Sequence, residues 1–148
     1  GYRVLLYPAP NDPGVLAPEG GRVLSLRGED GAAVFAAEMA RRGRGATLIL
    51  VSPYTSITEM ARRTLPVLPA AWLCPDHYDT LSKASGIAVP TIVIHGDEDE
   101  VVPFAMGQAV SEAIHGATLH VVKGGHHNDL FAGDRYGLVS LVVESAKR

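Results

Sequence analysis

Short runs of apolar residues alternate along the chain with longer stretches that have helical character. The runs are rich in Val, Ile and Leu and lack polar alternation, which is typical of strands buried on both faces of a parallel sheet. The predicted strands are Val4–Tyr7, Arg22–Leu26, Thr47–Val51, Thr91–Ile94 and Thr118–Val122.

The stretches between these strands carry helix signals. Ala32–Arg42 is rich in alanine and ends in two arginines and a glycine, which suit a helix C-terminus. Phe104–Ile114 follows a proline, and Asp134–Lys147 places Tyr136, Val139 and Val142 on one helical face. The alternation predicts an α/β fold: an open, mostly parallel sheet of about five strands with helices on both faces.

Two segments interrupt this alternation. Pro8–Gly21 contains four prolines and three glycines, so we expect no helix there. Thr55–Ala88 begins with a short predicted helix, Ser56–Arg63, and continues through three prolines around Trp72. We expect residues 55–88 to cover the strand ends of a single domain spanning residues 1–148.

Composition narrows the function classes. The 148 residues are 47% hydrophobic and 20% charged, with a formal net charge of -3, so there is no basic excess of the kind that binds nucleic acid. The sequence has no apolar run approaching the ~18 residues of a membrane span and no recognisable signal peptide. A single cysteine, Cys74, favours a reducing compartment, and we therefore expect a cytoplasmic protein. A first residue of Gly rather than Met is compatible with a processed chain or a fragment.

Polar residues follow the predicted strands, and in an open α/β sheet ligands bind at the carboxyl ends of the strands. His95–Pro103 follows one strand and contains Asp99, and Gly124–Asp129 follows the next and contains His127. A carboxylate that accepts from one imidazole nitrogen leaves the other nitrogen free to take a proton. The alternative interpretation is that Asp99 caps the helix near Pro103 and that the histidines are merely exposed.

These motifs resemble those of the α/β-hydrolase superfamily, especially the small serine hydrolases that include depalmitoylase-like α/β-hydrolase-domain proteins. The similar segments are Val51-Ser52-Pro53-Tyr54-Thr55-Ser56-Ile57, Ile94-His95-Gly96-Asp97-Glu98-Asp99-Glu100-Val101-Val102-Pro103 and Gly125-His126-His127-Asn128-Asp129-Leu130. The resemblance implies ester or thioester hydrolysis through an acyl-enzyme. It places the triad acid at Asp99 and the triad histidine at His127, with Asp97 and His126 as second choices.

The chain departs from this family at the nucleophile. The family has a serine in a Gly-x-Ser-x-Gly elbow, where this chain has Gly28-Glu29-Asp30-Gly31, without serine and one residue short. The loop that completes the oxyanion hole precedes the first strand in the family, so the resemblance implies an N-terminally truncated domain that lacks the first strands.

Several functions remain open. The chain is interpreted first as a hydrolase impaired by loss of the elbow serine. One alternative is that Asp30 is the nucleophile, as in dehalogenase-like and epoxide-hydrolase-like relatives. Ser52 or Ser56 is a further alternative, although Ser56 with Glu59 reads as a capping box. Two further interpretations are that the chain is a non-catalytic binding module, or that it is a fragment without a function of its own.

The remaining expectations concern ligands. We expect Ser52, Tyr54, Trp72 and Phe104 to contact a small-molecule ester or acyl substrate. No cofactor is expected, because no glycine-rich phosphate loop opens a helix. No metal is expected, because adjacent residues such as His126 and His127 point apart. Exposed sheet edges favour self-association.

Overall fold

The computed structural model describes residues 2–5, 22–25, 37, 40–42, 47–64 and 79–147. Its framework is a five-stranded sheet in the order β2-β1-β3-β4-β5. All neighbouring strands are parallel. The strands are β1 (Tyr2–Leu5), β2 (Arg22–Ser25), β3 (Leu48–Val51), β4 (Thr91–Gly96) and β5 (Thr118–Val122). The predicted open parallel α/β sheet is confirmed.

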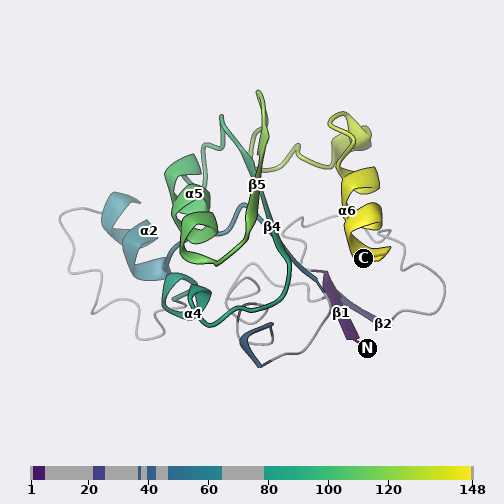
Figure 1. Ribbon diagram of the computed structural model, residues 1–148. Helices are drawn as coiled ribbons and strands as arrows, with labels where there is room; N and C mark the ends of the chain where they lie inside the picture. Colours follow the sequence, from purple (N-terminus) through teal and green to yellow (C-terminus); the bar gives the residue numbers. More distant parts are fainter. Residues whose placement is uncertain are drawn as a thin grey trace.

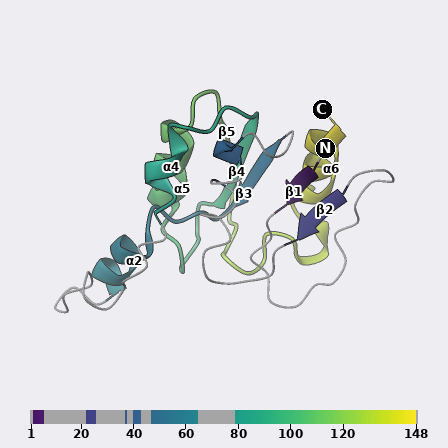
Figure 2. The same cartoon turned by 90° about the horizontal axis from the view of Figure 1, so that it is seen from below.

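Helices cover both faces of this sheet (Figure 1). Figures 1 and 2 place α4 and α5 on one side of β4 and β5, and α6 on the other. The helices are α2 (Ile57–Thr64), α4 (Leu81–Ala84), α5 (Phe104–Ala113) and α6 (Leu138–Lys147), with a 3₁₀ turn at Ala132–Asp134. Ala37, Ala40 and Arg41 also have helical backbone.

Neighbouring residues of each central strand face opposite layers. Leu48, Leu50 and Val93 are buried in one core cluster with residues of α4 and α5. Ile49 and Ile94 belong to the other cluster, which includes residues of α6. Because successive strand side chains point to opposite faces, both positions must be apolar, which explains the absence of polar alternation in the sequence.

The element boundaries differ from the sequence predictions at two informative places. β4 continues two residues beyond Ile94, so His95 lies within the strand and is fully buried. The predicted helix Asp134–Lys147 begins only at Leu138, so Tyr136 does not belong to it. Gly137 has a φ of 65° and Asp134 a φ of 49°, a left-handed conformation that interrupts a right-handed helix.

The predicted cover segment, residues 55–88, is described only in part. Ser56 caps α2 by accepting a hydrogen bond from the Glu59 N–H at 3.2 Å, as the capping-box pattern predicts. The Thr55 carbonyl accepts from the N–H groups of Thr80 and Leu81, which ties this loop to the start of α4. Trp72 and Cys74 lie outside the described residues, as do Pro8–Gly21 and the elbow segment Gly28–Gly31.

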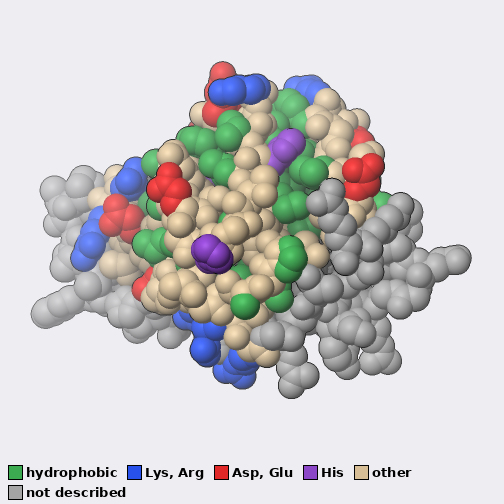
Figure 3. All heavy atoms as spheres, viewed as in Figure 1, with side chains coloured by type: hydrophobic (Ala, Val, Ile, Leu, Met, Phe, Trp, Pro, Cys, Tyr) green, Lys and Arg blue, Asp and Glu red, His purple; other side chains and the backbone are tan. Residues whose placement is uncertain are grey.

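Two further observations concern the charge on the surface and the length of the helices. On the face drawn in Figure 3, Lys and Arg side chains lie among Asp and Glu side chains. Within the part of the chain that the structure describes, no helix has both the length and the apolar character needed to cross a membrane.

The two-sided burial of β3 gives the first testable prediction. Leu50 is 1% exposed, so we expect Leu50→Ala to lower the free energy of unfolding by about 2–5 kcal/mol through lost transfer energy and a cavity. Leu81→Ala is the matched control, because Leu81 is 39% exposed and should cost much less. Urea unfolding of both variants measures the difference, and equal losses would contradict the assigned core.

Candidate active site

The carboxyl ends of β3, β4 and β5 lie at one edge of the sheet because the strands are parallel. The loops that follow them begin at Ser52, Asp97 and Lys123. Backbone hydrogen bonds join two of these loops. The Asp97 N–H donates to the Val122 carbonyl and the Glu98 N–H to the Gly125 carbonyl, both at 3.1 Å. We call the loop after β4, residues 97–103, the acid loop, and the loop after β5, residues 123–131, the histidine loop. The backbone hydrogen bonds therefore hold the acid loop against the end of β5 and the histidine loop.

A pair of glycines permits this close approach. A Cβ added to Gly96 would lie 2.1 Å from the Gly125 carbonyl oxygen, and a Cβ on Gly125 would lie 2.8 Å from a Leu130 methyl carbon. Backbone atoms cannot yield to such overlap as the end of a flexible side chain can. Gly96 therefore allows the close approach of the loops that carry Asp99 and His127, whereas Gly125 leaves room for the side chains of Leu130 and Val122.

Asp97 reinforces the same junction. Its carboxylate accepts hydrogen bonds from Lys123 Nζ at 2.8 Å and from the Gly124 N–H at 2.7 Å. These bonds, the Lys123 contact foremost, lower the pKa of Asp97 below its ordinary value. The Asp97 carboxylate thus binds the start of the loop after β5 through Lys123 and Gly124.

Asp99 is buried at the centre of the acid loop, with a side chain that is 0% exposed. One carboxylate oxygen, Oδ1, accepts from the N–H groups of Val101 at 3.0 Å and Val102 at 2.7 Å. The other, Oδ2, lies 3.4 Å from His95 Nε2. Burial acts to raise the pKa of Asp99, but hydrogen bonds from His127, His95 and Val102 outweigh it and hold the pKa well below the usual range.

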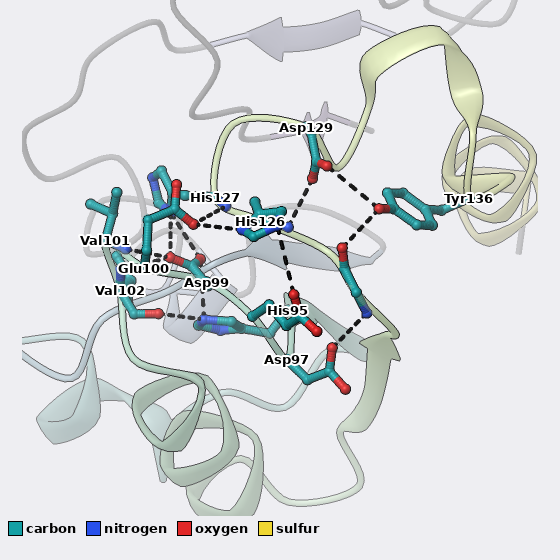
Figure 4. A network of polar contacts seen from close by, with 12 residues as sticks. His95, Asp97, Asp99, Glu100, Val101, Val102, His126, His127, Asp129 and Tyr136 are labelled. Carbon is teal, nitrogen blue, oxygen red and sulfur yellow. Dashed lines mark hydrogen bonds and ion pairs between the residues drawn. The ribbon is translucent and has the colours of Figure 1, made fainter.

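His127 lies directly against this carboxylate (Figure 4). Its Nδ1 is 2.9 Å from Asp99 Oδ2 and 3.1 Å from Oδ1. An ionised carboxylate only accepts, so Nδ1 carries the hydrogen and donates. The His127 side chain is 15% exposed, and its Nε2 makes no hydrogen bond within the described residues. In the neutral imidazole, this contact therefore selects the tautomer in which Nδ1 carries the hydrogen and Nε2 has a free lone pair.

His126, by contrast, points into an acidic surface cluster. Its Nδ1 lies 3.1 Å from Glu100 Oε2, and its Nε2 lies 3.7 Å from Glu98. The hydrogen bond to Glu100 is the main cause of a raised pKa at His126. Glu100 also accepts from the His127 N–H at 3.4 Å, and Asp129 accepts from the His126 N–H at 2.8 Å. The structure thus pairs Asp99 with His127, and Glu100 with His126.

The other residues singled out in the sequence are only partly brought to this site. Ser52 is 5% exposed with a φ of 44°, and its buried hydroxyl has no hydrogen-bond partner among the described residues, although it contributes slightly to the lowered pKa of Asp99. Phe104 packs edge-on to His95, with ring centroids 5.8 Å apart. Tyr54 is half-buried after β3. Asp30 and Trp72 lie outside the described residues.

His95 is a site residue that the sequence reasoning missed. Its ring is buried beneath Asp99 and lies four positions before it in the chain. The available signal was the histidine at the end of an apolar strand, directly before the acid loop.

In the described part of the chain, no group of three or more His, Cys, Asp or Glu side chains is arranged to hold a metal ion.

An open parallel sheet with a buried acid after one strand, paired to a histidine after the next, defines a protein of the α/β-hydrolase type. No protein-family model matches the chain. An uncharacterised Mycobacterium tuberculosis protein is 34% identical over 103 residues, which are 69% of this chain and 37% of that protein. Human α/β-hydrolase domain-containing protein 17B is 34% identical over 106 residues, 71% of this chain and 35% of that protein. The chain spans about a third of the length of these curated relatives.

Solved structures share the fold. The enol-lactonase of Burkholderia xenovorans LB400 superposes with a TM-score of 0.59 and 16% identity, covering 86% of this chain and 66% of that one. An α/β-hydrolase enzyme from a Medee basin deep-sea metagenome library gives a TM-score of 0.62 and 11% identity, covering 86% of this chain and 65% of that one. The chain belongs to the α/β-hydrolase superfamily.

The close approach of Gly96 to the Gly125 backbone predicts that a side chain at position 96 destabilises the fold by steric overlap. A glycine with open space around it should not show this effect. We expect Gly96→Ala to lower the free energy of unfolding by about 2–3 kcal/mol, because the new methyl group overlaps the Gly125 backbone. Gly116→Ala meets no atom within 4 Å and should cost only about 1 kcal/mol for its φ of 74°. Denaturant unfolding compares them, and a Gly96→Ala variant as stable as Gly116→Ala would contradict the close approach.

The lowered pKa of Asp99 predicts a pH-dependent contribution to stability. A carboxylate whose pKa is depressed by folding stabilises the protein above its unfolded pKa of about 3.9, and loses this contribution as pH falls toward the folded value. We expect Asp99→Asn to lower the free energy of unfolding by about 3 kcal/mol at pH 7. The deficit should shrink by about 1 kcal/mol between pH 5 and pH 3.

Urea unfolding at the three pH values measures this deficit against wild type. Glu112→Gln is the matched control, since Glu112 is an exposed acid on α5. A deficit for Asp99→Asn that stays constant from pH 7 to pH 3 would contradict the assignment of an ionised, hydrogen-bonded Asp99.

Proposed function

We propose that the chain carries the base and its orienting acid for hydrolysis of carboxylic esters or thioesters through an acyl-enzyme. His127 is the general base and acid, and Asp99 orients it. The observation that supports the proposal is the contact of 2.9 Å between His127 Nδ1 and the buried Asp99 carboxylate. Membership of the superfamily supports the reaction class, and the depalmitoylase-like sequence motifs favour acyl esters and thioesters as substrates.

The geometry suits each proton transfer. Nε2 of His127 takes the proton from the nucleophile as that group attacks the acyl carbon, and the imidazolium formed is stabilised by ionised Asp99. The same Nε2 then gives the proton to the leaving alkoxide or thiolate. In the second half, His127 deprotonates a water molecule that attacks the acyl-enzyme, and the acid product leaves. Asp99 keeps its negative charge throughout, since its pKa lies well below the working range.

The family's serine nucleophile has no counterpart in the elbow segment of this chain, and we propose that its absence limits turnover. The elbow segment Gly28-Glu29-Asp30-Gly31 has no serine. Asp30 is the alternative nucleophile: its carboxylate would attack an alkyl carbon, displacing a halide or opening an epoxide, and water activated by His127 would hydrolyse the alkyl-enzyme ester to release the alcohol and free Asp30. Ser56 is not favoured for this role, because its hydroxyl caps α2. Ser52 is not favoured either, because its side chain is buried beside Asp99.

A non-catalytic binding module is the second candidate, and the missing elbow serine is the observation that favours it. Such a protein keeps the fold and retains the Asp99–His127 pair for structural reasons. The two candidates differ in what removal of the imidazole does. It abolishes turnover in the hydrolase and changes only stability in the binding module.

The test is hydrolysis of a short p-nitrophenyl ester by wild type and by His127→Ala. We expect a rate above buffer that falls by at least about 10³-fold in the variant, because the base is lost. His115→Ala is the matched control, since His115 is exposed in the turn between α5 and β5 and should leave the rate unchanged. Equal rates for wild type and His127→Ala, both folded, would reject the proposed hydrolysis of esters through an acyl-enzyme and favour the binding module.

A further inference from the structure

We infer that His95 is a positioning residue that holds Asp99 in the orientation His127 requires. This inference rests on the proposed role of the Asp99–His127 pair. Among the described residues, no hydrogen bond or ion pair joins His95 to His127, and the polar partners of His95 Nε2 are Val102 and Asp99. Its effect is exerted through the acid, to which it presents a ring nitrogen from within β4 (Figure 4).

The contacts of His95 fix where its hydrogen lies. Nε2 is 2.9 Å from the Val102 carbonyl oxygen, and a carbonyl can only accept. Nε2 therefore carries the hydrogen. Its N–H is therefore directed at the Val102 carbonyl, and the same nitrogen lies 3.4 Å from Asp99 Oδ2, so the positive end of the N–H dipole lies near that carboxylate.

Three contacts link His95, Val102 and Asp99 to one another. The Val102 N–H donates to Asp99 at 2.7 Å, and the Val102 carbonyl accepts from His95. Asp99 Oδ1 is thus held by the backbone, while Oδ2 faces both His95 and His127. Without His95, His127 is the only N–H-bearing side chain that is described within 3.5 Å of Oδ2, and the loop loses the hydrogen bond that anchors the Val102 carbonyl.

Packing prevents the His95 ring from turning away. The ring is fully buried, and Phe104 meets it edge-on. On the other side a Cβ at Gly107 would lie 2.0 Å from His95 Nδ1, so only a glycine of α5 leaves room for the imidazole. Nδ1 is buried without a hydrogen-bond partner. A proton on Nδ1 would have no acceptor, which favours the Nε2–H tautomer further.

The consequence for catalysis concerns orientation rather than substrate binding. A carboxylate that rotates away from His127 Nδ1 allows the imidazole to change direction or tautomer. Small misplacements of a catalytic group lower turnover on the order of 10-fold to 100-fold. We therefore expect loss of His95 to lower kcat by that factor and to leave KM unchanged.

The test compares His95→Leu with His95→Gln, whose amide keeps a donor at the position of Nε2. His120→Leu is the control, as it replaces a half-buried histidine of the neighbouring strand β5. The readouts are kcat and KM for a p-nitrophenyl ester and the far-downfield proton resonance of His127 Nδ1–H, which reports the bond to Asp99 without requiring activity.

We expect the resonance to be lost or shifted upfield in His95→Leu and retained in His95→Gln and His120→Leu. A folded His95→Leu with the wild-type resonance and the wild-type kcat would overturn the inference. If the wild-type chain lacks esterase activity, the proposed function fails while the resonance still decides the role of His95.

A measurement on the wild-type chain covers the case in which His95→Leu does not fold. The ¹⁵N chemical shifts of the His95 ring identify the protonated nitrogen. A proton on Nε2 supports the inference, and a neutral ring protonated on Nδ1 overturns it, because such a ring cannot donate to Val102 and Asp99.

Discussion

The structure of the site depends on keeping one carboxylate ionised inside the protein. Asp99 has no exposed side-chain surface, and burying a charge is unfavourable unless it is fully hydrogen-bonded. Two backbone N–H groups and the His127 imidazole donate hydrogen bonds to it, His95 Nε2 lies 3.4 Å away, and together these groups hold its pKa low. The acid loop after β4, the histidine loop after β5 and the ring of His95 are all arranged around this one group.

The glycine contact between the loops makes that arrangement possible. Asp99 and His127 lie 28 positions apart in sequence, and the parallel sheet brings their strands side by side without fixing the last few ångströms. Contact of Gly96 with the Gly125 backbone sets that distance, and the bonds from Asp97 to Lys123 and Gly124 secure it. The parallel sheet places the two loops next to each other, and the absence of a side chain at Gly96 allows them to come into contact.

The sequence allowed prediction of much of this fold, because parallel strands buried on both faces leave an unmistakable apolar pattern. Thr118–Val122 was predicted to the residue, while β4 was predicted two residues short. His95 was missed for that reason, since a polar residue at the end of an apolar run reads as the start of a loop. The start of α6 was misplaced because periodicity does not register the left-handed backbone at Asp134 and Gly137.

The contact between Asp99 and His127 could be predicted from the sequence, the contacts that surround this pair could not, and the catalytic roles of the two residues stay a prediction. Acid-then-histidine order after consecutive strands, together with the family resemblance, selected Asp99 and His127. No pattern in the sequence showed that Glu100 accepts from both His126 and the His127 backbone, or that Asp97 binds across the loops. Those contacts depend on turn geometry, where a change of one residue reverses the direction of a side chain.

We propose that Asp99 and His127 act as one unit in ester hydrolysis, and the decisive measurement is a double-mutant cycle on the rate of that reaction. The rates of Asp99→Asn, His127→Ala and the double variant are compared with wild type in folded protein. Residues that act as a unit have strongly non-additive effects. We expect the double variant to be no slower than His127→Ala alone. A double variant slowed by the product of the two single effects would contradict it.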